Sequence, residues 1–505
     1  MSVAARGYAW YSPSRAATPA KGHSRPRIAE PALQGPACAH PLLEPVRMDP
    51  DLQTPNAARL PAPERRGAPR EVLHLAYPVI LTQISVTLMQ LVDSAMVGRI
   101  GSSELGAVGF GGIWIWTCLS LFVGLATSVQ TFVAQEDGAG RVDACGAWAW
   151  HGFYTVVPVS ALAGLAIYFG APLLIAAIDP SEALGALATD YMQARSFGSA
   201  GLIAAMVLIS FFRGFGDTRT PLYCTVAAVL VNGLLDYALI FGNFGLPQWG
   251  VYGAGFATSV AEYFQLACLL FFFTRRTVRR RYDTRPRRPQ ASASRRLLRT
   301  GLPIGGQWCL EMTSFAAFSS IVVRMGDASM AASQALIVLL SLSFMQAIAI
   351  SIAVATLVGR YVGANDFKAA ERSFRTGLGL ALVLGGLFAA LFLAIPGPLI
   401  GIFTKDVDVL ALTAPLLLMA AAFQIVDAFG IVADGALRGA GDTLWPFVVR
   451  FLLAWGVQVP LAWFLGITLG GGLTWMWIGS TIYVALLASI LVARFRSGAW
   501  KRIRI

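Results

Sequence analysis

The sequence predicts an all-α membrane protein whose twelve transmembrane helices form two pseudo-symmetric six-helix bundles. Hydrophobic residues make up 56% of the 505 residues and charged residues only 13%, whereas soluble domains carry about 25% charged residues. From Glu71 onward, apolar stretches of about twenty residues, the length of a membrane-spanning helix, follow one another. The apolar region also contains an internal repeat, since Pro78 to Pro221 recurs as Pro303 to Pro446. The offset between the two copies is 303 − 78 = 225 residues.

Pairs of identical residues at this offset support the repeat. They include Arg99 and Arg324, Thr131 and Thr356, Gly138 and Gly363, Arg213 and Arg438, and Asp217 and Asp442. A duplicated hydrophobic half is typical of secondary transporters, in which two similar bundles enclose a site near the middle of the membrane. The repeat therefore predicts transport by alternating access of the two halves.

The chain divides into five expected segments. Residues 1–70, rich in Pro, Ala and Arg, are expected to be a disordered cytoplasmic extension that transport does not need, with Met48 as an alternative start to Met1. The remaining segments are an N-terminal bundle at 71–275, a basic linker loop at 276–297, a C-terminal bundle at 298–495 and a basic tail at 496–505. The expected spans are 72–98, 105–134, 146–169, 184–212, 219–243, 252–275, 298–323, 330–359, 371–395, 409–437, 445–466 and 473–494.

Loop charges predict the orientation in the membrane. The central loop from Arg275 to Arg299 contains eleven arginines and a single acid, Asp283. The alternate loops 170–183, 244–251 and 467–472 contain no Lys or Arg. Because positively charged loops stay in the cytoplasm, we expect an inner-membrane protein with this loop and both termini on the cytoplasmic side.

Charge and residue usage also exclude several function classes. The formal net charge is +12, but the arginines flank apolar spans, so membrane lipids rather than nucleic acid are the expected partners. Six cysteines show no C-x-x-C spacing, and the four histidines all lie in the first half. We therefore expect no metal site, no cofactor and no enzymatic activity.

Ionisable residues inside the spans are the candidates for function. Asp93, Asp236, Glu311 and Asp427 lie well within expected spans, where each would cost about 2.5–3.5 kcal/mol if it faced lipid. We therefore expect them to face a cavity or a polar partner. Burial raises the pKa of a carboxyl group, which lets it bind and release a proton during a cycle. A purely structural role in the packed bundle remains the alternative.

Two amides accompany these acids. Asn232 and Asp236 are four residues apart and share a helix face, so the amide can bond the acid or the same bound ion. Gln424 and Asp427, three residues apart, are expected to repeat this arrangement in the second half.

Several motifs carry a resemblance to a known family. They are L-V-D-S-A-M-V-G-R-I-G at Leu91–Gly101, R-G-F-G-D-T-R-T-P at Arg213–Pro221, G-L-P-I at Gly301–Ile304 and A-L-R-G-A-G-D-T at Ala436–Thr443. Together they resemble the multidrug and toxic compound extrusion (MATE) family, and V-N-G-L-L-D at Val231–Asp236 resembles its DinF-like branch. The resemblance implies a MATE-like, twelve-helix multidrug efflux antiporter that exports amphipathic, often cationic organic compounds against inward flow of H⁺ or Na⁺.

By position, the resemblance assigns roles in both halves. Asp93 matches the first-helix acid of the family, and Asn232 with Asp236 matches the N-x-x-x-D pair of the DinF-like branch. Glu311 and Asp427 match acids of the NorM-like branch, so which half carries the coupling site stays open. The apolar surroundings of Asp236 offer few further oxygens, which favours H⁺. Na⁺ held by Asp93, Asn232 and Asp236 is the alternative.

Another function within the same superfamily is also open. A lipid-linked oligosaccharide flippase shares the architecture but often lines its cavity with several cations, whereas the charges expected inside the spans here are acidic. A monomer is expected.

Overall fold

The computed structural model describes residues 63–178, 181–401, 407–503 and 505. Every regular element in these ranges is helical, which confirms the predicted all-α class. The first half contains η1 (Pro63–Arg65), α1 (Pro69–Gly98), α2 (Ser102–Gly138), α3 (Val142–Ile178), α4 (Glu182–Ser196), α5 (Ser199–Gly214), α6 (Arg219–Phe241), α7 (Gly250–Thr274) and α8 (Arg276–Tyr282). The second half contains α9 (Ala291–Val323), α10 (Asp327–Gly363), α11 (Phe367–Ala394), α12 (Pro396–Gly401), α13 (Val407–Ala440), α14 (Leu444–Leu453), α15 (Val459–Trp463) and α16 (Gly472–Arg496).

The helices match the twelve predicted spans. Ten spans in the described ranges are long and apolar enough to cross a membrane, and α4 with α5, bent by 48°, makes an eleventh. The twelfth is α9, whose first turns are basic and whose apolar part is diluted by polar residues such as Gln307 and Glu311. The eleventh predicted span, 445–466, is irregular, because π-helical turns at Ala454–Gln458 and Phe464–Thr468 flank Pro460, which lacks a backbone N–H.

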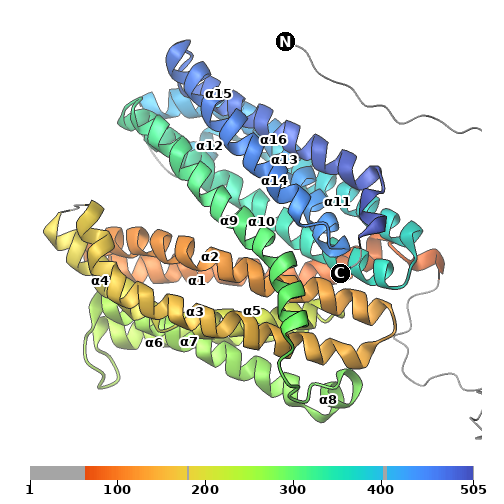
Figure 1. The fold of residues 1–505 in the computed structure, drawn as a ribbon. Coiled ribbons are helices and arrows are strands. Elements are labelled where there is room, and N and C mark those ends of the chain that lie inside the picture. The colour runs from red at the N-terminus through yellow and green to blue at the C-terminus, as the bar shows by residue number, and fades with distance from the viewer. Residues whose placement is uncertain (1–62, 179–180, 402–406, 504) are drawn as a thin grey trace, which may run out of the picture. The chain divides into compact units, whose positions relative to one another are not determined.

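The spans form two bundles, α1–α7 and α9–α16, each with its own apolar interior (Figure 1). Helices α2 and α10 join them, since α2 packs against α9 and α10 packs against both α1 and α2. Glycines allow this close packing: a Cβ on Gly124 would lie 2.3 Å from Cα of Gly305 in α9. Small residues at such contacts are the usual means by which helices associate in membranes.

The tightest contact between the bundles is a crossing of α2 and α10 near their C-terminal ends. A Cβ on Gly138 would lie 1.8 Å from the carbonyl oxygen of Arg360, and one on Gly363 would lie 2.0 Å from that of Gln135. Both pairs obey the repeat, because 138 + 225 = 363 and 135 + 225 = 360. Gly138 of α2 therefore packs against α10, and its repeat equivalent Gly363 of α10 packs against α2, as expected for helices related by a pseudo-twofold axis.

Two hydrogen bonds beside the crossing follow the same symmetry. The hydroxyl of Thr131 donates to the carbonyl oxygen of Arg438 at 3.1 Å, and that of Thr356 donates to the carbonyl oxygen of Arg213 at 3.0 Å. Arg213 and Arg438 each open one copy of the repeated R-G-x-G-D-T turn. Each threonine thus ties its own bundle to the turn of the other bundle.

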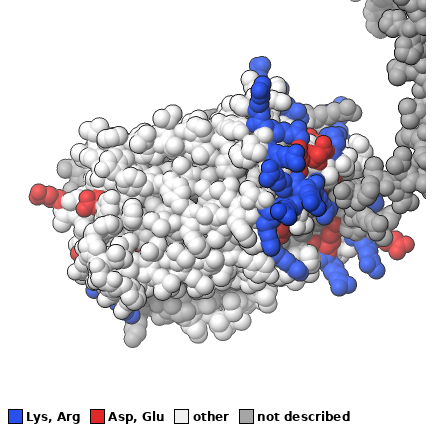
Figure 2. Space-filling model, turned by 90° about the horizontal axis from the view of Figure 1, so that it is seen from below, with Lys and Arg blue, Asp and Glu red and all other residues white. Residues whose placement is uncertain are grey.

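This end of the bundles is also the basic end. Figure 2 shows Lys and Arg side chains gathered at one end of the helices. A largely buried ion pair joins the bundles there, with Arg360 Nε 2.8 Å from Asp137 Oδ2. The orientation of this end towards the cytoplasm remains a prediction.

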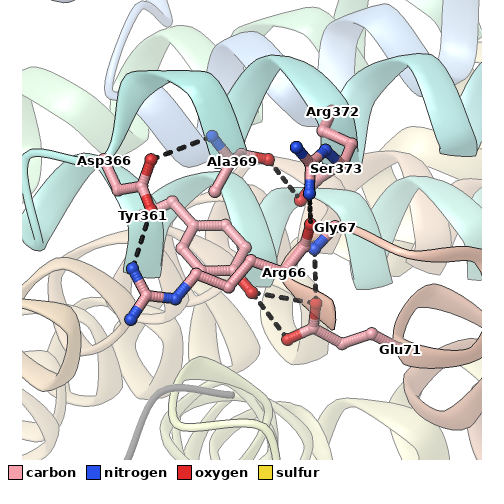
Figure 3. A network of polar contacts seen from close by, with 8 residues as sticks. All are labelled: Arg66, Gly67, Glu71, Tyr361, Asp366, Ala369, Arg372 and Ser373. Carbon is pink, nitrogen blue, oxygen red and sulfur yellow. Dashed lines mark hydrogen bonds and ion pairs between the residues drawn. The ribbon is translucent and has the colours of Figure 1, made fainter. Parts of the chain in front are cut away.

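The chain before α1 attaches the first bundle to the second (Figure 3). Arg66 Nη1 donates to Asp366 Oδ2 at 2.9 Å, and the Tyr361 hydroxyl donates to both carboxyl oxygens of Glu71 at 2.8 Å. Gly67 adopts φ +70°, and a Cβ there would lie 2.7 Å from the backbone nitrogen of Ser373. These contacts place the start of α1 against α10 and α11.

Arg66 and Gly67 fall within the expected N-terminal extension, residues 1–70, and both contact the second bundle. Residues 1–62 lie outside the described residues. Burial raises the pKa of Asp366, but hydrogen bonds from Arg66 and from the Ala369 amide outweigh it and hold that pKa below its usual value. The carboxylate of Asp366 is thus ionised and bound to Arg66 at neutral pH.

Removal of residues 63–69 should weaken the attachment between the bundles. We expect a protein that begins after residue 69 to melt a few degrees below one that begins after residue 62, because only the shorter protein lacks the Arg66 and Gly67 contacts. Thermal unfolding of both proteins in detergent measures the difference. Equal melting temperatures would show that these contacts do not stabilise the fold.

The predicted topology is tested with single cysteines in a background that lacks the native ones. A membrane-impermeant thiol reagent added to intact cells should label a cysteine in the 244–251 loop and leave one at the exposed position Ser292 unlabelled. Permeabilised cells provide the control, because both positions should then react. The reverse pattern in intact cells would invert the orientation.

Candidate functional site

A buried polar centre in the first bundle joins α1 to α6. The side-chain nitrogen of Asn232 donates to Asp93 Oδ1 at 2.9 Å and makes a short contact with Asp236 Oδ2. Asn232 and Asp236 are fully buried, and Asp93 is half-buried. The structure thus brings together the three residues that the sequence singled out in the first half, whereas their role remains a prediction.

This centre has unused polar capacity. The two carboxyl groups share one amide nitrogen, and the buried oxygens Asn232 Oδ1 and Asp236 Oδ1 have no hydrogen-bond partner among the described residues. Within the described residues, no ion pair joins Asp93 or Asp236 to a basic side chain. Buried oxygens without partners are costly, so this arrangement favours an additional positive species at the centre.

A buried ion pair lies near this centre and was missed in the sequence. Arg195 Nη1 of α4 lies 3.0 Å from Glu262 Oε2 of α7, and the two side chains are only 13% and 12% exposed. The charge of Arg195 acts on both Asp93 and Asp236. Both members of the pair fall within predicted spans, 184–212 and 252–275, so opposite charges in two apolar spans were the signal that could have found it.

The second bundle contains a different arrangement. Arg450 Nη1 of α14 lies 3.4 Å from Glu311 Oε2 of α9, with side chains 14% and 41% exposed. The charge of Arg450 also acts on Asp427 and Asp434. The expectation that the charges inside the spans are acidic is therefore wrong, because Arg195 and Arg450 are embedded among them.

Gln424 and Asp427 do not repeat the Asn232–Asp236 arrangement. The amide of Gln424 donates to the carbonyl oxygen of Gly385 in α11 at 3.3 Å, and its buried side-chain oxygen has no partner in the part of the chain that the structure describes. Asp427 instead lies under the influence of the Glu311 and Arg450 charges.

The two polar centres therefore differ in charge. In the second bundle, Glu311 has its own arginine, so the ion pair carries no net charge. In the first bundle, the nearest arginine, Arg195, is already paired with Glu262. Within the described residues, the Asp93–Asn232–Asp236 centre holds two acids without a basic partner, and Asp427 in the second bundle makes no ion pair either but lies near both Glu311 and Arg450.

Metal binding at this centre would need ligands in addition to His, Cys, Asp and Glu side chains. Among the described residues, no group of three or more His, Cys, Asp or Glu side chains is placed to hold a metal ion. A coupling Na⁺ at the first-bundle centre would therefore depend on the Asn232 oxygen in addition to the two carboxyl groups.

Comparisons with known proteins agree with the repeat. The MatE family profile matches residues 78–238 and 303–464, and the two matches begin 303 − 78 = 225 residues apart. Similar curated proteins include the multidrug resistance protein NorM of Geobacillus kaustophilus, 32% identical over 442 residues, which covers 86% of this chain and 96% of that protein. The NorM protein of Pseudomonas putida is 30% identical over 444 residues and covers 86% and 95%.

Solved structures share the fold at lower identity. A multidrug resistance MATE transporter of the MOP superfamily in an outward-facing conformation superposes with a TM-score of 0.78 at 20% identity and covers 87% of this chain and 98% of that one. The eukaryotic MATE transporter AtDTX14 gives a TM-score of 0.76 at 19% identity and covers 86% and 96%. The predicted DinF-like branch is not tested by these comparisons and stays a prediction.

The buried pair Arg195–Glu262 should behave as a coupled unit. We expect Arg195→Met and Glu262→Leu each to lower the free energy of unfolding by about 3–5 kcal/mol, because each leaves a partner buried without compensation. The double variant Arg195→Met with Glu262→Leu should be more stable than either single variant.

Thermal and denaturant unfolding of the purified variants test this coupling. The exposed pair Arg287–Asp283, with side chains 44% and 35% exposed, is the control, and its loss should cost less than about 1 kcal/mol. Additive effects of the two buried substitutions would contradict the coupling.

Proposed function

The chain belongs to the MatE family, and we propose that this membrane transporter exports amphipathic, often cationic organic compounds in exchange for protons. Transport rather than catalysis is the activity of the family, and the relatives named above are multidrug resistance proteins. The proton, the cationic substrate and the site of exchange are our proposals for this chain.

The main observation behind this proposal is that Asp93 and Asp236 both contact the side-chain amide of Asn232. Two carboxylates held together in a site with little water repel each other, so one proton between them lowers the energy of the pair. A cationic substrate relieves the same repulsion. Proton and substrate therefore compete for one pair of acids, which is the requirement for exchange.

The contacts between the bundles support a cycle about a closed cytoplasmic end. The α2–α10 crossing, the two threonine bonds and the Arg360–Asp137 pair hold the basic end shut. We propose that protons enter from outside in this state, neutralise the acids and release the substrate outward. Each proton that moves inward gains about 2.3 kcal/mol per 100 mV of membrane potential.

The second-bundle acids have a supporting role in this proposal. Arg450 balances Glu311, which reduces the attraction of this centre for a cation. We therefore assign coupling to the first bundle and expect Glu311 and Asp427 to shape the second-half wall of the substrate pathway.

A proton fits this centre better than Na⁺. A dehydrated metal ion needs several oxygens at short range, and the centre supplies those of two carboxyl groups and one amide, whereas a proton needs one carboxyl oxygen. Na⁺ remains the alternative because neither Asn232 Oδ1 nor Asp236 Oδ1 has a partner within the described ranges.

The alternative of a lipid-linked oligosaccharide flippase receives less support. Its anionic substrate would need uncompensated cations, but Arg195 and Arg450 each lie beside a glutamate. The first-bundle centre instead presents two acids without a basic partner, which suits a cation.

Asp236→Asn should abolish exchange, because it mimics the protonated acid. In proteoliposomes with an imposed pH gradient, we expect wild-type protein to transport ethidium and Asp236→Asn to lose at least tenfold of that rate, about 1.4 kcal/mol or more in the barrier. The exposed acid variant Asp283→Asn is the control and should transport normally. Normal, pH-dependent transport by Asp236→Asn would refute the assignment of Asp236 to the coupling site.

The coupling ion is identified by varying the pH gradient and the Na⁺ gradient one at a time in the same liposomes. Transport that follows the pH gradient in the absence of Na⁺ supports the proton as the coupling ion. Transport that follows Na⁺ and ignores pH would replace the proton by Na⁺ and leave the site assignment intact. Movement of a fluorescent lipid-linked sugar in place of ethidium would favour the flippase.

A further inference from the structure

A groove runs along the first bundle between α1 and α6. Its volume is about 460 Å³, and its lining is mainly apolar: Leu81 and Ser85 from α1, and Leu222, Tyr223, Val226 and Leu230 from α6. This volume lies within the range of about 300–1,000 Å³ that is usual for ligand pockets.

A polar cluster lies on the same faces of the two helices, one turn from the groove. Arg219 Nε donates to the Tyr77 hydroxyl at 3.1 Å, and Arg219 Nη2 lies 3.2 Å from His74 Nε2. Along α1, His74, Tyr77 and Leu81 follow at spacings of three and four residues, which places them on one face. Arg219 and Tyr223, four residues apart, do the same on α6.

The groove lies on the face turned away from the other bundle and from the polar centre. Gln83 of α1 reaches α10, where its amide donates to Met345 Sδ at 3.4 Å, and two residues away along the helix Leu81 and Ser85 point to the opposite side. On α6, Asp236 is fully buried, whereas Tyr223 and Leu230 are 63% and 65% exposed. The lining residues of the groove come from α1 and α6 and none from the second bundle, so these exposed apolar side chains are accessible to lipid.

The dimensions match one leaflet of a bilayer. From His74 to Ser85 the helix rises roughly 16 Å at 1.5 Å per residue, and half of a hydrocarbon core is roughly 15 Å. The polar cluster therefore lies at headgroup level when the groove lies at the level of the acyl chains. It also lies at the basic end of the helices, where α6 begins.

We propose that this groove binds an anionic phospholipid of the adjoining leaflet. Its phosphate contacts Arg219, His74 and Tyr77, and one acyl chain fills the groove. Within the described residues, no ion pair joins Arg219 to an acid, and the nearby carboxylate of Asp217 is already bound by the amides of Arg219 and Thr220. A phosphate supplies the negative charge that this cluster lacks.

The lipid would join the two helices that carry the polar centre. Asp93 lies on α1 and Asp236 on α6, so a phosphate at one end and an acyl chain along the groove would hold these helices together from outside. The binding itself does not depend on the proposed coupling ion or substrate.

Native mass spectrometry of the purified full-length transporter tests the site with phosphatidylglycerol, using phosphatidylcholine as the neutral comparison. We expect wild-type protein to bind phosphatidylglycerol more tightly than phosphatidylcholine. The substitution Arg219→Gln should lower the affinity for phosphatidylglycerol roughly tenfold. Arg219→Lys should restore most of the binding. The control Arg280→Gln, an exposed arginine of α8, should bind as wild type does.

A second variant tests the acyl chain without touching the polar cluster. Ala227→Trp fills the groove beside Val226 and should weaken phosphatidylglycerol binding, whereas Ala390→Trp on the exposed surface of α11 should not. Variants are compared only if they elute and melt as wild type does before lipid is added. Unchanged binding by Arg219→Gln or by Ala227→Trp, or equal loss in the Arg280→Gln control, would overturn the proposal.

Discussion

The low polarity of the membrane interior is the constraint on which this structure depends. Every embedded charge or backbone polar group must find a partner inside the protein, and the pairs Arg195–Glu262 and Arg450–Glu311 meet this demand with opposite charges. Asp93 and Asp236 meet it only in part, since they share the single amide of Asn232 and otherwise interact with each other rather than with a basic side chain of their own. We propose that a bound proton or a cationic substrate completes this site, because either one relieves the repulsion between the two acids.

Duplication gives the two bundles a common junction. Gly138 and Gly363 permit the close crossing of α2 and α10, and the paired threonine bonds tie each bundle to the turn of the other. Because the same contacts are made twice, the junction stabilises one end of the bundles symmetrically. The two polar centres, in contrast, have diverged from each other, which is consistent with a shared framework that serves different tasks in the two halves.

Much of the fold followed from the sequence, because apolar runs and the 225-residue offset report directly on spans and bundles. The meeting of Asn232 with Asp236 followed from their four-residue spacing. The partner of Gln424 did not, because it depends on how closely α11 approaches α13 at Gly385. Arg195 and Arg450 were overlooked although each lies in a predicted apolar span, because the sequence shows that opposite charges occur in different spans but not which of them meet in the fold. The contacts of Arg66 and Gly67 with the second bundle were likewise hidden in a polar, Pro-rich segment without periodicity.

The central claim is that a proton and a cationic substrate compete for Asp93 and Asp236. Proton release on substrate binding tests it most directly, by calorimetric titration of purified protein with an ethidium-like cation in buffers of different ionisation enthalpy. The account predicts that the binding enthalpy of wild-type protein depends on the buffer, since bound protons leave as the cation arrives, and that this dependence disappears in Asp236→Asn. Equal proton release by both proteins, or none by wild-type protein, would contradict it.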